Sequence, residues 1–327
     1  MFKVFLIILL LIINNAIYSS EQAKRPKLKD FADIFFNSLN DDSYALNITQ
    51  GYGYNSNIHE ITNEDYNYDP EYYYFSKSSD FHNTHLDSYY SFYFPNNFLS
   101  TFYFDFYQKL HLKQETNILD ERYFSPGIEF KYSFNAIHAL SFLYLYTHEQ
   151  ERKINRGKFF TYSNQHKFTP TYFYTFSNGN KLSFETFLKN IQYVDLEPLN
   201  DYGVKIGFMT YQFNNYVYPS LSGGYNYINE TDEGILDSKE YFLSLSNYFY
   251  PFDNFNGYLT LDYTKRSNQD ITYAYQNFGI NLYATASPII FESLSVNLSI
   301  SYDYYKIKSK LSKDILEYVL SLTYCAF

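Results

Sequence analysis

Seven histidines are the residues of this 327-residue chain best suited to acid–base or metal chemistry. His148 precedes Glu149, but the second histidine of a helical zinc motif is missing and the segment has the pattern of a strand. His82 and His85 fall in a predicted loop, where they either share a metal ion or are simply solvated. No histidine pattern therefore predicts a metal site.

Nucleophilic chemistry would need a serine paired with a base. Ser141 or Ser183 with His138 or His166 are the available pairs, and their spacing gives them no support. The single cysteine, Cys325, is expected to be a small packed residue rather than a reactive thiol. We therefore predict no catalytic residues, no cofactor and no enzymatic activity.

Charged residues in long alternating segments are more informative. Phe102 and Phe104 take one parity, while Tyr103 and Asp105 take the other. Successive strand side chains point to opposite faces, so each such segment has one apolar and one polar face. The apolar face carries essentially no charge, and a Lys or Arg facing lipid at the bilayer midplane costs about 2–4 kcal/mol. The polar face is predicted to line a lumen, through Asp105, Glu129, Lys131, Glu185, Lys189, Lys205, Asp262 and Asp303.

Both signs of charge occur among these lumen residues. A strongly selective pore would cluster one sign at its constriction. We therefore expect weak ion selectivity if the lumen conducts. Inward-facing tyrosines, such as Tyr103 and Tyr275, are expected to fill part of the interior.

The length of the alternating segments distinguishes a membrane barrel from a soluble sandwich. Sandwich strands usually run about 5–6 residues, whereas a tilted strand that crosses a bilayer needs about 9–11. Short and long connections also alternate, which is typical of short periplasmic turns and longer external loops. Fourteen strands are predicted, and an extra pair within 71–84 would make sixteen. Their ranges are 44–54, 85–94, 98–111, 121–134, 138–150, 166–176, 181–194, 201–213, 217–228, 239–250, 256–266, 271–286, 294–307 and 314–327.

Composition excludes several other classes of protein. With 41 Tyr and 33 Phe the chain is too aromatic for a disordered protein, and one cysteine excludes a disulfide-stapled domain. A pI of about 5.2 argues against a nucleic-acid partner. No run of 18 apolar residues follows the N-terminus, which excludes a polytopic helical membrane protein. The predicted fold is all-β: a transmembrane, antiparallel, up-and-down β-barrel.

The N-terminal residues predict the cellular location. Residues 1–20 have a basic start at Lys3, an apolar core and small residues at Ser19 and Ser20, which is the pattern of a cleaved signal peptide. Residues 21–42 are expected to form a short periplasmic lead-in, either an amphipathic helix or a flexible tether. Residues 43–327 are expected to form the barrel. We therefore predict a protein of the bacterial outer membrane, in contact with its lipid and lipopolysaccharide.

The C-terminal strand carries a candidate assembly signal. The chain ends at Phe327, and a terminal aromatic residue is the expected signal for the barrel assembly machinery, which would be a partner. The apolar residues of this strand, such as Leu320 and Leu322, are one residue out of phase with Phe327.

The first predicted strand also carries a family resemblance. Residues 50–58 read Gln-Gly-Tyr-Gly-Tyr-Asn-Ser-Asn-Ile, which resembles the Gly-x-x-x-Asp-Ser-Asn opening of the barrel in surface lipoprotein assembly modifier proteins, with Asn55 in place of Asp. Arg266-Ser-Asn268 followed by Tyr273-Ala-Tyr275 resembles a later pattern of the same barrels. The resemblance covers about 43–327 and implies a fourteen-stranded barrel, a surface lipoprotein cargo and no catalytic residues. Only residues 21–42 precede the barrel, where that family usually has a long helical-repeat domain.

Three functions are consistent with these features. The first is a translocation barrel for surface lipoproteins, which a weak seam between 44–54 and 314–327 would favour. The second is a diffusion porin for small solutes, and the third is a structural or adhesive barrel without transport.

Overall fold

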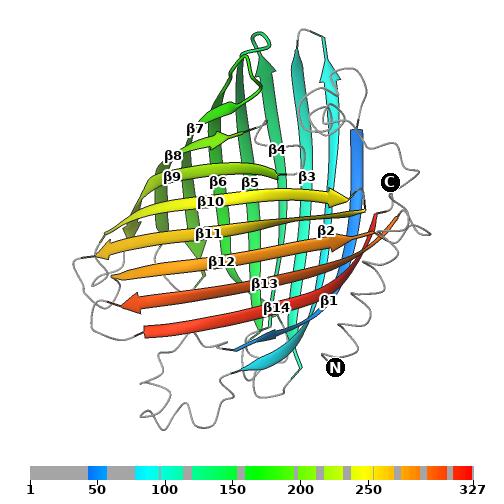
Figure 1. The fold of residues 1–327 in the computed structure, drawn as a ribbon. Coiled ribbons are helices and arrows are strands. Elements are labelled where there is room, and N and C mark those ends of the chain that lie inside the picture. Colours follow the sequence, from blue (N-terminus) through cyan, green and yellow to red (C-terminus); the bar gives the residue numbers. More distant parts are fainter. Residues whose placement is uncertain are drawn as a thin grey trace.

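The computed structural model describes residues 43–56, 78–95, 97–112, 120–152, 159–194, 198–210, 217–230, 237–252, 254–268, 274–287, 293–307 and 312–325. In these ranges the regular structure is entirely β, in fourteen strands (Figure 1). The strands are β1 (Ser43–Asn55), β2 (Ser79–Phe94), β3 (Phe98–His111), β4 (Glu121–Ser133), β5 (His138–Arg152), β6 (Phe159–Thr175), β7 (Lys181–Tyr193), β8 (Leu199–Met209), β9 (Val217–Glu230), β10 (Ser238–Phe252), β11 (Phe255–Asn268), β12 (Tyr275–Ala286), β13 (Leu294–Ile307) and β14 (Ser312–Cys325).

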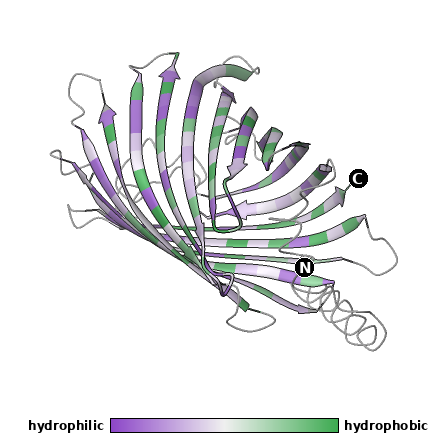
Figure 2. Cartoon of the chain, turned by 90° about the horizontal axis from the view of Figure 1, so that it is seen from above, coloured by the Kyte–Doolittle hydropathy of each residue, from purple (hydrophilic) through white to green (hydrophobic). Residues whose placement is uncertain are grey.

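The strands form one closed antiparallel barrel. Each strand pairs with its neighbours in the sequence, and β1 closes the sheet by pairing with β14. In Figure 1 the strands of the near wall, β10–β14, cross those of the far wall, β2–β6, at a steep angle. This crossing is expected because barrel closure requires every strand to tilt against the barrel axis. Viewed from above, the sheet curves around a central lumen (Figure 2).

The prediction of a fourteen-stranded antiparallel barrel is confirmed, but four strand ends differ from the prediction by four residues or more. β2 begins at Ser79 rather than 85, β6 begins at Phe159 rather than 166, β8 ends at Met209 rather than 213, and β12 begins at Tyr275 rather than 271. The early part of β2 looked like a loop because its residues are polar, yet it pairs with β1 from Ser79 onward. In β6 a register shift opposite Glu149 and Gln150 breaks the two-residue alternation that the prediction relied on.

Large apolar side chains cover the outside of the barrel rather than its interior. On β8, for example, Val204 and Ile206 are exposed, while Lys205 between them faces the other way. The same arrangement continues around the sheet, with Phe104, Phe142, Leu245, Ile280 and Leu320 all exposed. Such a surface suits contact with lipid, since a soluble protein rarely exposes so large an apolar area.

The polar face is the concave one. Lys109 on β3 contacts Glu317 on β14, with a Nζ–Oε2 distance of 2.7 Å, although β1 and β2 lie between these strands. Side chains two and three strands apart meet only on the inner side of a closed sheet, where they converge. The residues that share the parity of Lys109 and Glu317 therefore line the lumen.

Several predictions concern residues outside the described ranges. These are the signal peptide at 1–20, the lead-in at 21–42 and the terminal Phe327, together with residues 71–77 of the suggested extra strand pair. Among the described residues no helix is long and apolar enough to cross a membrane.

A matched pair of substitutions at the middle of β10 tests the two faces. Leu245 is on the outer face, whereas Ser244 is on the inner face opposite Asp262. Leu245→Lys should lower the free energy of unfolding by about 2–4 kcal/mol, because the ammonium group enters hydrocarbon. Ser244→Lys places the same charge beside a carboxylate and should change it far less. Urea unfolding in lipid vesicles measures both, and equal losses would contradict the assignment of the faces.

Candidate functional site

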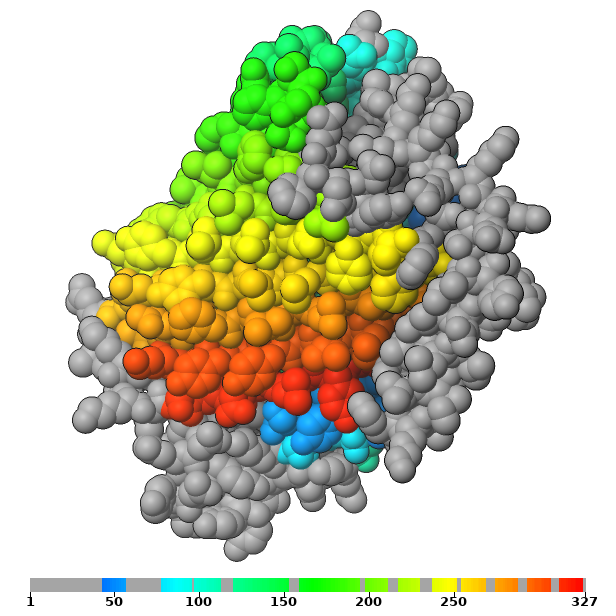
Figure 3. All heavy atoms as spheres, viewed as in Figure 1, coloured from blue at the N-terminus to red at the C-terminus, as the bar shows by residue number. Residues whose placement is uncertain are grey.

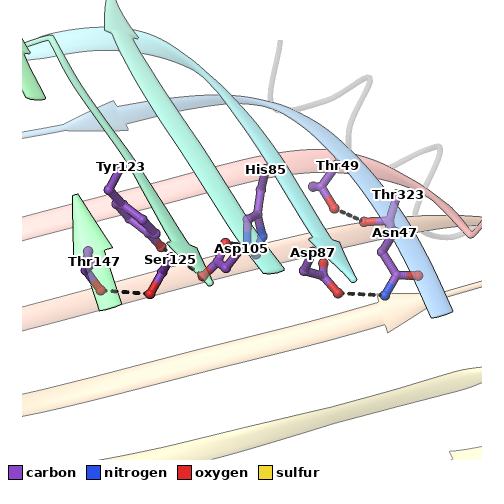
Figure 4. Close-up of polar contacts among 9 residues, drawn as sticks. All are labelled: Asn47, Thr49, His85, Asp87, Asp105, Tyr123, Ser125, Thr147 and Thr323. Atoms are coloured by element: carbon purple, nitrogen blue, oxygen red, sulfur yellow. Dashed lines mark hydrogen bonds and ion pairs between the residues drawn. The ribbon is translucent and has the colours of Figure 1, made fainter. Parts of the chain in front are cut away.

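A belt of polar side chains crosses the lumen wall from β14 to β5. Each contact of the belt joins side chains from two adjacent strands (Figure 4). Thr49 Oγ1 lies 2.6 Å from Thr323 Oγ1, and Ser125 Oγ lies 2.7 Å from Thr147 Oγ1. We call these residues the polar belt: Asn47, Thr49, His85, Asp87, Asp105, Tyr123, Ser125, Thr147 and Thr323.

Two carboxylates stand side by side at the centre of the polar belt. Asp87 and Asp105 are direct cross-strand partners, an arrangement that destabilises a sheet when both are charged. Each has a separate polar partner: Asn47 donates to Asp87 Oδ2 at 2.8 Å, and His85 Nε2 lies 2.7 Å from Asp105 Oδ1. Tyr123 also donates to Asp105, at 3.4 Å. These contacts offset the repulsion and hold both acids in the lumen.

The side chains of the polar belt border a part of the lumen that solvent can reach. The side chains of His85 and Asp105 keep 36% and 37% of their surface exposed, although both point into the barrel. Apolar packing does not fill the volume next to them. Sequence reasoning included Asp105 but missed its histidine partner, because His85 stood at the very start of the predicted strand 85–94 and was considered only with His82 for a metal site on the preceding loop.

The structure places the eight predicted lumen residues on the inner face of their strands. Glu129 accepts a hydrogen bond from Tyr103 Oη at 2.7 Å, and Lys131 Nζ lies 5.5 Å from the ring centroid of Phe173. On β7 and β8, Glu185 is the cross-strand partner of Lys205, and Lys189 is the partner of Asp201; opposite charges therefore pair there.

Asp262 and Asp303 flank Gly279 on its two neighbouring strands. Gly279 is the cross-strand partner of both. A Cβ at this position would lie 2.9 Å from Asp303 Oδ1 and 3.5 Å from Asp262 Cβ, so a larger residue would displace the carboxylates. Asn281 donates to Asp262 and Asn277 donates to Asp303, each at 3.1 Å. A glycine here therefore leaves room for two acids with amide partners.

The lumen charges differ between opposite walls. In a closed sheet of fourteen strands, β6, β7 and β8 face β13, β14 and β1 across the lumen. The β6–β8 wall carries most of the lysines: Lys167, Lys181, Lys189 and Lys205. Acidic residues dominate on β11–β14 and β2–β3: Asp262, Asp303, Glu317, Asp87 and Asp105. Lys167 and Lys181 were missed by sequence reasoning, although both have the parity of the small polar residues.

The seam between β1 and β14 is the shortest ladder and is reinforced from inside. It pairs Asn47–Asn55 with Cys325–Glu317. Glu317 Oε2 accepts from Lys109 at 2.7 Å and from Asn55 at 2.8 Å. Gly53 makes room for this contact, because a Cβ there would lie 2.5 Å from the ring of Phe81, the residue on which Lys109 rests. We call Lys109, Asn55 and Glu317 the seam clasp.

The candidate catalytic and metal pairs are not brought together. His138 and His166 lie on the outer face, where they contact Tyr172 and Tyr144, whereas Ser141 lies on the inner face. His82 and His85 lie on opposite faces of β2. Within the described ranges no three His, Cys, Asp or Glu residues gather as a metal site requires.

Comparison of the sequence with protein-family models and with curated proteins gives no match. Solved structures do match. The outer-membrane channel DcaP of Acinetobacter baumannii aligns with a TM-score of 0.54 and 9% identity, over 87% of this chain and 97% of that one. An anion-selective porin from Comamonas acidovorans gives a TM-score of 0.45 and 9% identity, over 87% and 100%. A mutant of the monoaromatic hydrocarbon channel TodX gives 0.46 and 8%, over 87% and 90%.

Of these three structures, the DcaP channel alone exceeds a TM-score of 0.5, and at 9% identity the likeness shows a shared fold alone. The comparisons give no support to the specific resemblance to surface lipoprotein assembly modifier proteins. The fold of this chain is that of an outer-membrane β-barrel.

Proposed function

We propose that this chain is an outer-membrane channel through which small polar solutes diffuse. The observation that carries the proposal is the lumen lining: ionisable side chains such as His85 and Asp105 point inward and yet remain about one-third exposed. Charged groups are stable there only in contact with water or with partners. A water-containing lumen inside an apolar outer surface is the arrangement that a diffusion channel needs.

The distribution of charge suggests the class of solute. Lysines of β6–β8 face carboxylates across the lumen, and Glu185 and Asp201 lie beside two of these lysines. A lumen with both signs does not repel either ion strongly, so weak ion selectivity follows. Small solutes that carry both positive and negative groups, or neutral polar groups, fit this lining best.

Single-channel conductance in planar bilayers tests the proposal. Protein lacking residues 1–20 should give stable ohmic openings, and protein also lacking 21–42 shows whether that segment obstructs the lumen. Absence of channel openings from both forms would contradict the proposal.

Changing Lys167, Lys189 and Lys205 to Glu should shift the reversal potential toward cation preference, because the lysine-rich wall becomes acidic. Lys239→Glu, the same change on the outer face, should leave it unaltered.

Lipoprotein translocation is a second candidate, favoured by one observation. The β1–β14 ladder is the shortest in the barrel, so lateral opening there would break the fewest strand contacts. The seam clasp acts against such opening. A diffusion channel needs a seam that stays closed, whereas a translocator of the lipoprotein type needs one that opens toward the membrane.

The natural cysteine provides a direct test of the seam. Cys325 is the cross-strand partner of Asn47, and Cβ atoms of such partners lie about 4.5–5.5 Å apart, near the separation in a disulfide. Oxidised Asn47→Cys should therefore lock β1 to β14. Conductance should persist, since solutes pass through the lumen. Conductance or surface export that stops on oxidation and returns on reduction, with Asn47→Ser unaffected, would instead indicate a working lateral gate.

A further inference from the structure

Charged residues of the outer face are confined to one end of the barrel. They lie near the strand ends that lead into the connections 56–78, 112–120, 153–158, 231–237, 269–274 and 308–311. The half of the outer face near the other end carries none on the fourteen strands. The outer-face charges are Asp80, Arg122, Arg152, Lys239, Lys265, Lys306 and Asp314.

Three of these charges form a basic patch on neighbouring strands. Lys239, Lys265 and Lys306 lie on β10, β11 and β13, and all three are exposed. Within the described part of the chain, none of them lies at ion-pair distance from a carboxylate. Arg152, at another part of the rim, is instead paired with Asp120 at 2.8 Å.

Two of the lysines bracket an amide. Gln276 on β12 is the cross-strand partner of both Lys265 and Lys306. Adjacent strands are about 4.7–4.9 Å apart, so the two lysine backbones are about 10 Å apart. Their flexible four-carbon side chains let both ammonium groups reach an anion held between them, over the amide of Gln276. Lys239 lies beside them, since its partner Ser267 is two residues from Lys265.

A row of aromatic side chains fixes the depth of this patch. Tyr263, Phe278 and Tyr304 are cross-strand partners one row closer to the middle of the barrel. Phe278 is 51% exposed, and its ring centroid is 4.9 Å from that of Tyr263. Aromatic rings collect at the boundary between hydrocarbon and headgroups. The three lysines therefore lie at the depth of lipid phosphates.

We infer that Lys239, Lys265 and Lys306, with Gln276, bind the phosphate groups of lipopolysaccharide, the phosphorylated glycolipid of the outer leaflet. The inference rests on the outer-membrane location in the proposed function and on the orientation predicted from the connection lengths, in which the end with the longer loops is external. It does not rest on conduction. Unpaired positive charge at headgroup depth complements a phosphate anion. Its restriction to the external end indicates a lipid found in that leaflet.

Thermal unfolding of the protein in phosphatidylcholine vesicles tests the inference. Bisphosphorylated lipid A is titrated in, because a ligand that binds the folded state raises the unfolding midpoint with its concentration. Dephosphorylated lipid A, phosphatidylglycerol and inorganic phosphate are the comparison probes. The variant Lys239→Ala/Lys265→Ala/Lys306→Ala is compared with Lys313→Ala, which removes a lysine of the same rim from the inner face, where it rests 4.5 Å from the ring of Tyr305.

Bisphosphorylated lipid A should stabilise the natural protein and the Lys313→Ala variant equally. Each outer lysine contributes about fivefold in affinity, so the triple variant should bind on the order of 100-fold more weakly. Equal stabilisation of the triple variant would overturn the site. Equal effects of phosphatidylglycerol or inorganic phosphate would overturn lipopolysaccharide as the occupant. Conductance of the triple variant should be unchanged, which separates failure of this site from failure of the channel.

Discussion

Closure of the sheet is the constraint on which the rest of the molecule depends. Hydrocarbon offers no hydrogen bonds, so every backbone group that crosses a bilayer must pair within the protein, and a sheet achieves this only without free edges. Here β1 and β14 meet antiparallel, as an even number of strands allows, and Figure 3 shows them side by side on the surface. Because their ladder is the shortest, Lys109 and Glu317 reach across the glycines of β1 to hold it.

Once the backbone is paired, the side chains on the two faces are selected by different surroundings, lipid outside the barrel and water inside it. Outward positions carry Leu, Phe, Val and Ile, with charge only near the end of the barrel that has the longer connections. Inward positions carry charges that need partners: Asp87 and Asp105 would repel each other without Asn47 and His85. The same physical rule, that charge requires water or a partner, explains why most of the outer face lacks charge and why the charged side chains of the lumen have hydrogen-bond partners.

The sequence predicted the architecture well because the period of two is a direct consequence of strand geometry. It located Asp262 and Asp303 on the polar parity, but not their positions on either side of Gly279, which depend on the register of three strands. Polar strand ends were harder to predict: residues 79–84 looked like a loop because β2 begins Ser-Asp-Phe-His-Asn-Thr, in which Phe81 is the one apolar residue. Contacts such as Lys109 with Glu317 join residues far apart in sequence, and no local pattern reports them.

The central claim is that one face of each strand meets water inside a membrane barrel, and cysteine labelling along β10 tests it most directly. In a Cys325→Ser background, residues 241–246 are changed to Cys one at a time and exposed to a water-soluble maleimide in vesicles. Phe242, Ser244 and Ser246, which face the lumen, should label, whereas the outward positions 241, 243 and 245 should not. Uniform labelling, or labelling of only the outward positions, would contradict the account.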